Sequence, residues 1–247
     1  MQNTPGDYLI QQFNTLKAMF EDKLLIESIE PSYTNKLFTY SNTVPYDSSR
    51  SSLSAKYFNS CKQYLAIFKN RSFHYLFKDA SIARFHYEFD KDYKLLSYNL
   101  HWFPCPFSSE FLSQFLDEDR KIEKISFFEY LDYIEEVDSF NYTNFSFRTP
   151  IRIDYDANYK GTKGSFHPTS HIHFQDTNTR AKNQDIYCLY RFFAFIIENC
   201  YPDYNYTFHN EENNISNKMI NESSYWLKCN KITDIELGEN INTSFRF

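Results

Sequence analysis

The chain has 247 residues, of which 42% are hydrophobic, so it can bury a proper core as one large or two small domains. Its formal net charge of −6 excludes a protein that coats nucleic acid through an overall positive charge, although a local basic groove still fits. No leader segment opens the chain and no apolar stretch reaches membrane-spanning length, so we expect a cytoplasmic protein with no membrane partner.

Cysteine and glycine usage excludes several further classes. The five cysteines are widely spaced and form no Cys-x-x-Cys pair, which predicts reduced thiols instead of a disulfide framework or a zinc ribbon. The chain has only 4 glycines and contains neither a Gly-x-Gly-x-x-Gly segment nor a Walker loop, so we exclude Rossmann and P-loop enzymes.

The first third of the chain is predicted to be helical with a long interruption. Apolar residues at three- and four-residue steps from Leu9 to Leu24 predict an amphipathic helix, capped by Asp7. Residues 31–54 are rich in Ser, Thr and Asn, which predicts a loop. A second apolar stripe from Leu53 to Phe68 predicts another helix.

From residue 83 the hydrophobic period changes from that of a helix to that of a strand. Apolar and polar residues alternate over 83–90 and again over 96–102, which predicts an antiparallel hairpin with one apolar and one polar face. Two helical segments, 109–116 and 126–136, are expected to follow.

The same alternation returns later in the chain. It predicts strands at 151–156 and 166–174, and an apolar helix at 186–200 that we expect to cross the sheet. The Asn- and Glu-rich residues 205–247 are expected to be a C-terminal appendage.

Together these elements predict an α+β fold with a mainly antiparallel sheet of about four to six strands. We expect helices packed on one face and a polar face bearing Asp and His residues on the other. Residues 1–204 are predicted to form a single domain, with an N-terminal helix and loop over 1–56 and a core over 57–204.

The polar face gathers groups that suit metal chemistry. Alternation places Asp154 and Asp156 on one side of their strand, and His171 and His173 on one side of the next. Paired strands can bring such carboxylates and imidazoles within reach of one ion. The set suits Mn²⁺, Fe²⁺ or Zn²⁺, with Mg²⁺ as a further candidate, and such an ion can acidify water or polarise a phosphoryl oxygen.

Other residues complete this hypothesis. His167, in a bend before a proline, is a candidate third ligand or general base, and with Asp154 and His171 it forms the candidate catalytic set. The candidate substrate-binding residues are three arginines: Arg84, Arg152 and Arg180.

A structural interpretation of the same residues stays open. Alternation alone would produce a polar ladder in which the two aspartates bond to the neighbouring histidines and to Arg152. His86 and His101 are interpreted as satisfied surface or core residues, not ligands.

Several motifs follow one another along the chain: Leu76-Phe-Lys-Asp-Ala-Ser81, Leu100-His-Trp-Phe-Pro-Cys-Pro106, Arg152-Ile-Asp-Tyr-Asp156, His167-Pro-Thr-Ser-His-Ile-His-Phe174 and Tyr201-Pro202. From about Tyr57 to Tyr204 the chain thereby resembles an uncharacterised bacterial family known as a domain of unknown function. That family usually has Gly at the position of Ala80. The resemblance implies one shared core but no biochemistry.

Two shorter segments suggest a second comparison. Asp154-Tyr-Asp156 and Ser170-His-Ile-His173 are similar to the D-x-D and Ser-x-His strands of archaeo-eukaryotic primases. In that family these strands carry two-metal nucleotidyl transfer, so the similarity implies metal-dependent chemistry on nucleotides.

Two classes of function follow. The first is a metal-dependent, nuclease-like enzyme that processes phosphodiesters or nucleotides, by analogy in a bacterial toxin or phage-defence module, with nucleic acid or a nucleotide as its partner. The second is a non-catalytic adaptor whose polar ladder stiffens the sheet and whose aromatic-rich helices bind a protein partner. The acidic net charge favours the second class, because a nuclease needs a basic approach for its substrate.

Overall fold

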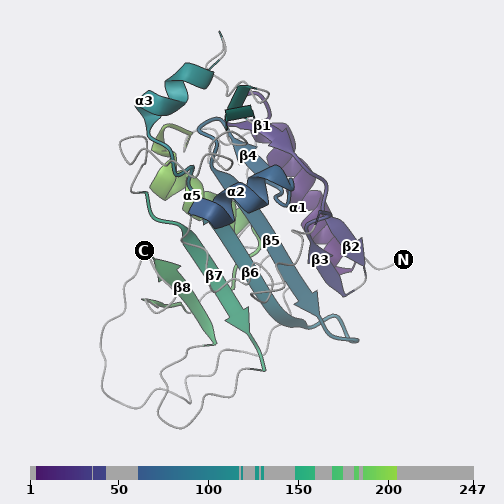
Figure 1. Cartoon of the computed structure of the whole chain (residues 1–247). Coiled ribbons are helices and arrows are strands. Elements are labelled where there is room, and N and C mark those ends of the chain that lie inside the picture. Colours follow the sequence, from purple (N-terminus) through teal and green to yellow (C-terminus); the bar gives the residue numbers. More distant parts are fainter. Residues whose placement is uncertain are drawn as a thin grey trace.

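A computed structural model describes residues 4–34, 36–42, 61–116, 118, 126–127, 129–130, 148–158, 169–174, 181–183 and 186–204. These residues form a mixed α+β fold built on one antiparallel sheet (Figure 1). The helices with defined bounds are α1 (Pro5–Phe20), α2 (Cys61–Lys69), α3 (Ser109–Leu112) and α5 (Leu189–Cys200), with short 3₁₀ turns at Ser113–Phe115 and Pro202–Tyr204.

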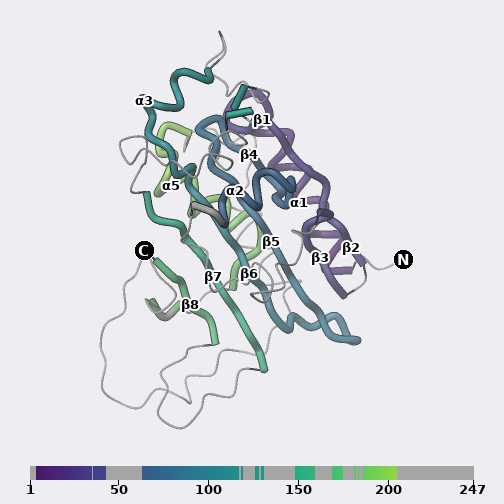
Figure 2. Tube along the Cα trace, viewed as in Figure 1, coloured from purple at the N-terminus to yellow at the C-terminus, as the bar shows by residue number. Residues whose placement is uncertain are grey.

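Within the part of the chain that the structure describes, the sheet has nine strands, more than the four to six expected. They are β1 (Leu25–Ser28), β2 (Ser32–Thr34), β3 (Leu37–Thr39), β4 (Tyr75–Phe77), β5 (Ile82–Phe89), β6 (Leu95–Phe103), β7 (Ile151–Asp156), β8 (Ser170–Phe174) and β9 (Ala181–Lys182). Their order is β1-β4-β5-β6-β7-β8-β9, and the β2–β3 hairpin joins through β3 to β5. From β5 to β8 the strands follow one another in sequence order, as the change from blue to green shows (Figure 2).

The β2–β3 hairpin corrects the loop predicted for residues 31–54. Each of its strands has three residues, which is too short for an alternating pattern to stand out. Pairing with β5 holds β3 in place, since Phe38 lies opposite Tyr87 and is fully buried. Residues 43–60, including the start of the second predicted helix, lie outside the described residues.

Helix α1 begins differently from the prediction. Its N-cap is Thr4, and Asp7 completes a capping box by accepting the backbone N–H of Thr4 at 2.7 Å. The helix ends at Phe20, so Leu24 belongs to the turn before β1. A proline at the first helical position and an acidic residue in the first turn explain why the helix starts here.

The main core lies between the sheet and helices α1 and α5. One cross-strand row of it consists of Phe85, Leu100, Ile153 and Ile172, all buried. Helices α1 and α5, far apart in sequence, contact each other: the Leu189 N–H donates to Gln12 Oε1 at 3.0 Å. Each fully buried large apolar side chain in this layer contributes roughly 1.5–3 kcal/mol.

Helices cover both faces of the sheet, so the expectation that they pack on one face alone is wrong. Figure 1 shows α2 in front of β5 and β6 and α5 behind the sheet. Ile67 and Phe68 of α2 belong to a second core together with Ile82 and Phe103, which share the polar face with Arg84 and His101. The polar face therefore turns apolar at this end, which gives α2 and α3 a surface to pack against.

Among the described residues, no helix is both long and apolar enough to cross a membrane. Helix α5 begins at Leu189, three residues later than predicted. Most of the predicted helix 126–136, residues 166–168 of the last predicted strand and the appendage 205–247 lie outside the described residues. The domain boundary at residue 204 therefore stays a prediction.

Candidate metal centre

The polar face of the central strands is organised in cross-strand rows. One row consists of Arg84, His101, Arg152 and His173, and the next consists of His86, Asn99, Asp154 and His171. The period of two along each strand, combined with this register, places all eight side chains on one face. The polar face expected from the sequence is thus formed, and Asp154 faces His171 directly.

Asp154, His171 and His173 converge at the edge of this face and are called the Asp–His triad below. One potential ligand atom from each lies within 4.8 Å of the other two. Asp154 Oδ2 is 3.3 Å from His173 Nε2 and 3.6 Å from His171 Nε2. Ligands held about 2.0–2.2 Å from a metal ion are separated by about 3.0–3.5 Å along the edges of its coordination shell. The triad thus comes close to the spacing that a metal ion requires.

Asn99 orients the carboxylate of the triad. Its Nδ2 donates a hydrogen bond to Asp154 Oδ1 from the neighbouring strand β6. This contact leaves Oδ2 directed toward the two histidines. Groups that fix a ligand in this way raise metal affinity because less orientation is lost on binding. Sequence alternation placed Asn99 on this face, but its role becomes visible only in the register.

Arg152 lies against the same atoms. Its Nε is 2.8 Å from Asp154 Oδ2, and its Nη2 is 2.6 Å from His173 Nε2. A guanidinium group can only donate, so His173 accepts through Nε2 and its ring hydrogen sits on Nδ1. Arg152 is therefore part of the triad's immediate surroundings.

Most of this cluster is shielded from water. His173 is fully buried, Arg152 and His171 are nearly so, and the Asp154 side chain is 17% exposed. Burial, reinforced by the charges of Arg84 and Arg152, lowers the pKa of His101 well below its ordinary value. His101 is then neutral at pH 7 and separates the two arginines in its row without adding charge.

Arg84 is held away from the triad. Its Nη2 donates to Ser72 Oγ at 3.1 Å, and its guanidinium lies 4.0 Å from the centre of the Tyr40 ring. Arg84 is also buried, so its guanidinium is not exposed to a substrate in solution. Neither Ser72 nor Tyr40 carried a signal in the sequence that linked it to this face.

Asp156 marks the open end of the polar face. It is exposed, lies outside the triad, and accepts the backbone N–H of Asn158 at 2.9 Å. Its register partner Ser97 donates to Glu88, which is also exposed. The solvent-facing end of this face is therefore acidic. His167 and Arg180 lie outside the described residues.

His86 and His74 have structural partners. His86 Nδ1 is 3.1 Å from Thr39 Oγ1, in keeping with its interpretation as a satisfied residue. His74 is buried, and its Nδ1 accepts the backbone N–H of Phe85 at 3.0 Å.

A shallow hollow on α1, lined by residues such as Gln11, Thr15 and Met19, lies on the helix that packs against the opposite face of the sheet.

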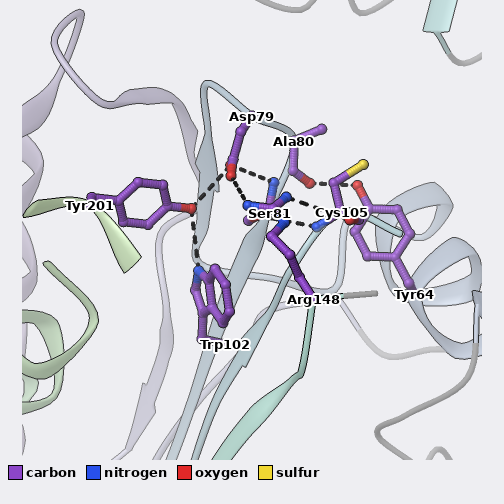
Figure 3. A network of polar contacts seen from close by, with 8 residues as sticks. All are labelled: Tyr64, Asp79, Ala80, Ser81, Trp102, Cys105, Arg148 and Tyr201. Carbon is purple, nitrogen blue, oxygen red and sulfur yellow. Dashed lines mark hydrogen bonds and ion pairs between the residues drawn. The ribbon is translucent and has the colours of Figure 1, made fainter. Parts of the chain in front are cut away.

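A second polar cluster surrounds the β4–β5 turn (Figure 3). Asp79 accepts hydrogen bonds from the Tyr201 hydroxyl at 3.0 Å and from Arg148 Nη1 at 2.5 Å. Trp102 Nε1 donates to the same hydroxyl at 3.3 Å, and Arg148 Nη2 reaches Ser81 Oγ at 3.3 Å. We call these five residues the turn cluster.

The turn cluster joins segments that are distant in sequence. It ties the turn, β6, the approach to β7 and the end of α5 to one another. Burial raises the pKa of the nearby Cys105 thiol to about 12, so this thiol is no nucleophile at neutral pH. The sequence motifs that contain residues of the turn cluster were visible, but the sequence indicated no common role for them. Their convergence indicates a structural clamp.

Comparison with known proteins locates the chain in one family. A comparison with curated proteins found no match, and a comparison with solved structures found none either. The family model of the uncharacterized conserved proteins DUF2290 matches residues 27–233, which include the triad and the turn cluster. Because that match spans most of the sequence, the chain belongs to the DUF2290 family.

Proposed function

We propose that the Asp–His triad binds one divalent transition-metal ion and that the protein uses this ion to cleave a phosphodiester or a nucleotide. The observation that carries the proposal is the convergence of three ligand atoms from β7 and β8 within 4.8 Å of one another. His171 and His173 are in register with Asp154 and Arg152, so the arrangement follows from strand pairing and not from a chance surface contact.

The ligand set indicates which ions fit best. Two imidazoles and one carboxylate suit Zn²⁺, Mn²⁺ or Fe²⁺, whereas Mg²⁺ prefers an all-oxygen shell and gives up water reluctantly. Three protein ligands also leave coordination positions for water and substrate. Zn²⁺ and Mn²⁺ are accordingly the ions to test first.

The choice of a phosphorylated substrate rests on charge and chemistry. A bound divalent ion would lower the pKa of water and neutralise charge on a phosphoryl oxygen. Arg152 adds a cation beside the triad. Exposed Glu88 and Asp156 at the open end would repel a long polyanion, which favours a compact substrate such as a nucleotide over a long strand. His167 stays the proposed general base, and Arg180 a proposed substrate contact, on sequence grounds.

Activity assays with matched variants test the proposal. Purified protein should hydrolyse bis(p-nitrophenyl) phosphate or a nucleotide in the presence of Mn²⁺, and EDTA should abolish the activity. His171→Asn should lower the rate by roughly 100-fold or more, because it removes a ligand. His86→Gln changes a histidine in the same row that lies outside the triad, so it should leave the rate unchanged. Equal rates for both variants would refute a catalytic triad.

A second function is favoured by one specific observation. Arg152 already contacts Asp154 and His173, which is how a structural polar ladder would look. In that case the protein would be a non-catalytic adaptor that binds a protein partner. Metal addition would then leave its thermal unfolding temperature unchanged, whereas a metal centre raises it by ligand linkage. A place in a toxin or phage-defence module would suit either function.

A further inference from the structure

Arg152 contacts two of the three atoms that a metal ion would need. Its Nε lies 2.8 Å from Asp154 Oδ2, and its Nη2 lies 2.6 Å from His173 Nε2. Asp154 Oδ2 lies 3.3 Å from His173 Nε2 and 3.6 Å from His171 Nε2, so the two atoms that Arg152 contacts are also well placed to bind an ion together with His171. Arg152 is thus the positive group that neutralises this carboxylate within the cluster.

A metal ion and the Arg152 guanidinium cannot both bind His173 Nε2 and Asp154 Oδ2 at the same time. The lone pair on His173 Nε2 that accepts from Arg152 is the lone pair that would bind the metal. An ion about 2.0–2.2 Å from Asp154 Oδ2 would also lie close to a positively charged group in a buried, weakly screened place. The shared lone pair and the repulsion between the two positive charges both require that Arg152 leave these atoms when a metal ion binds.

We propose that Arg152 is an internal competitor of the metal: its guanidinium occupies the ligand atoms in the metal-free protein, and a metal ion binds by displacing it. This inference rests on the proposed metal site. It assigns Arg152 a part in setting metal affinity, which differs from its expected part in substrate binding. His101 lies opposite Arg152 in the neighbouring strand and is neutral, so it would not repel the displaced guanidinium.

Isothermal titration of the full chain with Zn²⁺ tests the proposal. Arg152→Gln removes the competing cation and should bind Zn²⁺ about ten-fold or more tightly than the wild type. Arg84→Gln is the matched control, since it removes another buried arginine of the same row that touches Ser72 and Tyr40 and no triad atom. It should change the affinity by no more than about two-fold.

A measurement on the wild-type protein covers the case in which Arg152→Gln does not fold. The Nε–H signal of Arg152, identified in nitrogen-15 NMR by its loss in Arg152→Lys, should shift or broaden away when Zn²⁺ is added. Zinc binding that leaves this signal unchanged would overturn the proposal, as would equal zinc affinity in wild type and Arg152→Gln. If the wild type and every variant fail to bind zinc, the metal site itself is wrong, and that result is distinct from a failure of displacement alone.

Discussion

Arg152 and Asp154 lie two positions apart on one face of β7, with the guanidinium Nε 2.8 Å from the carboxylate Oδ2. The Arg152 side chain is 6% exposed and that of Asp154 is 17% exposed, so water screens the pair only weakly. An ion pair of this kind stabilises the fold little more than well-packed apolar residues would, but removing one partner is strongly destabilising.

The metal-free protein should therefore depend strongly on Asp154. Asp154→Asn keeps the size of the side chain and removes its charge, which leaves Arg152 buried without this carboxylate. We expect a loss of about 3 kcal/mol in the free energy of unfolding, measured by urea denaturation. Adding Arg152→Gln should recover part of that loss. Lys17→Gln, which breaks the more exposed pair with Glu30, serves as the control and should cost under about 0.5 kcal/mol. An equal loss in both single variants would contradict the expected dependence.

The turn cluster should contribute moderately to stability. Asp79→Asn weakens the contact with Arg148, whose side chain is 36% exposed, so screening reduces the charge contribution. With the hydrogen bond from Tyr201 also affected, we expect a loss of about 1–2 kcal/mol in the free energy of unfolding. A double-mutant cycle with Tyr201→Phe should show coupling between the two positions, and strict additivity would contradict the clamp.

His74 should make stability depend on acidity. Burial lowers its pKa from the ordinary 6.5 to about 3 in the folded protein. Between these two values the unfolded chain binds a proton at this residue and the folded protein does not, so stability falls as the pH falls from 6.5 toward 3. The slope from one such histidine is about 1.4 kcal/mol per pH unit. His74→Asn keeps an acceptor for the Phe85 N–H and should have a shallower slope between pH 6 and 4.5 than the wild type; identical slopes would exclude a buried neutral histidine.

Because α2 packs on the polar side of the sheet, truncating a buried side chain of this helix should strongly destabilise the fold. Ile67 is fully buried in the second core. Ile67→Ala should lower the free energy of unfolding by about 2–5 kcal/mol, because it leaves a cavity between α2 and the sheet. Lys91→Ala, on an exposed turn, should change it by less than about 0.5 kcal/mol. A small effect at Ile67 would mean that α2 does not cover this face.

Much of the central sheet could be predicted because its strands alternate. The residues from Ile151 to Asp156 form β7 with the predicted bounds, and the polar face carries the residues expected of it. The short strands β2 and β3 were missed because three residues cannot show a period. Helices near α2 and α3 were predicted, but their place on the polar side was not, because Ile82 and Phe103 look like ordinary strand ends until α2 is seen to pack on them.

The sequence could predict which residue types share the polar face, but not how their side chains are arranged on it. Alternation could place Asp154 and His171 on one face, and the strand register then set them opposite each other. The position of the Arg152 guanidinium depends on side-chain torsions that no sequence pattern encodes. The exclusion of Asp156 from the triad is similar, since it follows from the turn in which its carboxylate accepts the Asn158 N–H.

Metal stoichiometry tests the central claim most directly. The full chain is incubated with excess Zn²⁺ or Mn²⁺, dialysed against metal-free buffer and analysed by mass spectrometry of the elements. The proposed centre predicts about one ion per chain for the wild type and for His86→Gln, and almost none for a His171→Asn/His173→Asn variant that circular dichroism shows to be folded. A wild-type protein without bound metal, or a folded double variant that retains a full equivalent, would contradict a metal centre at Asp154, His171 and His173.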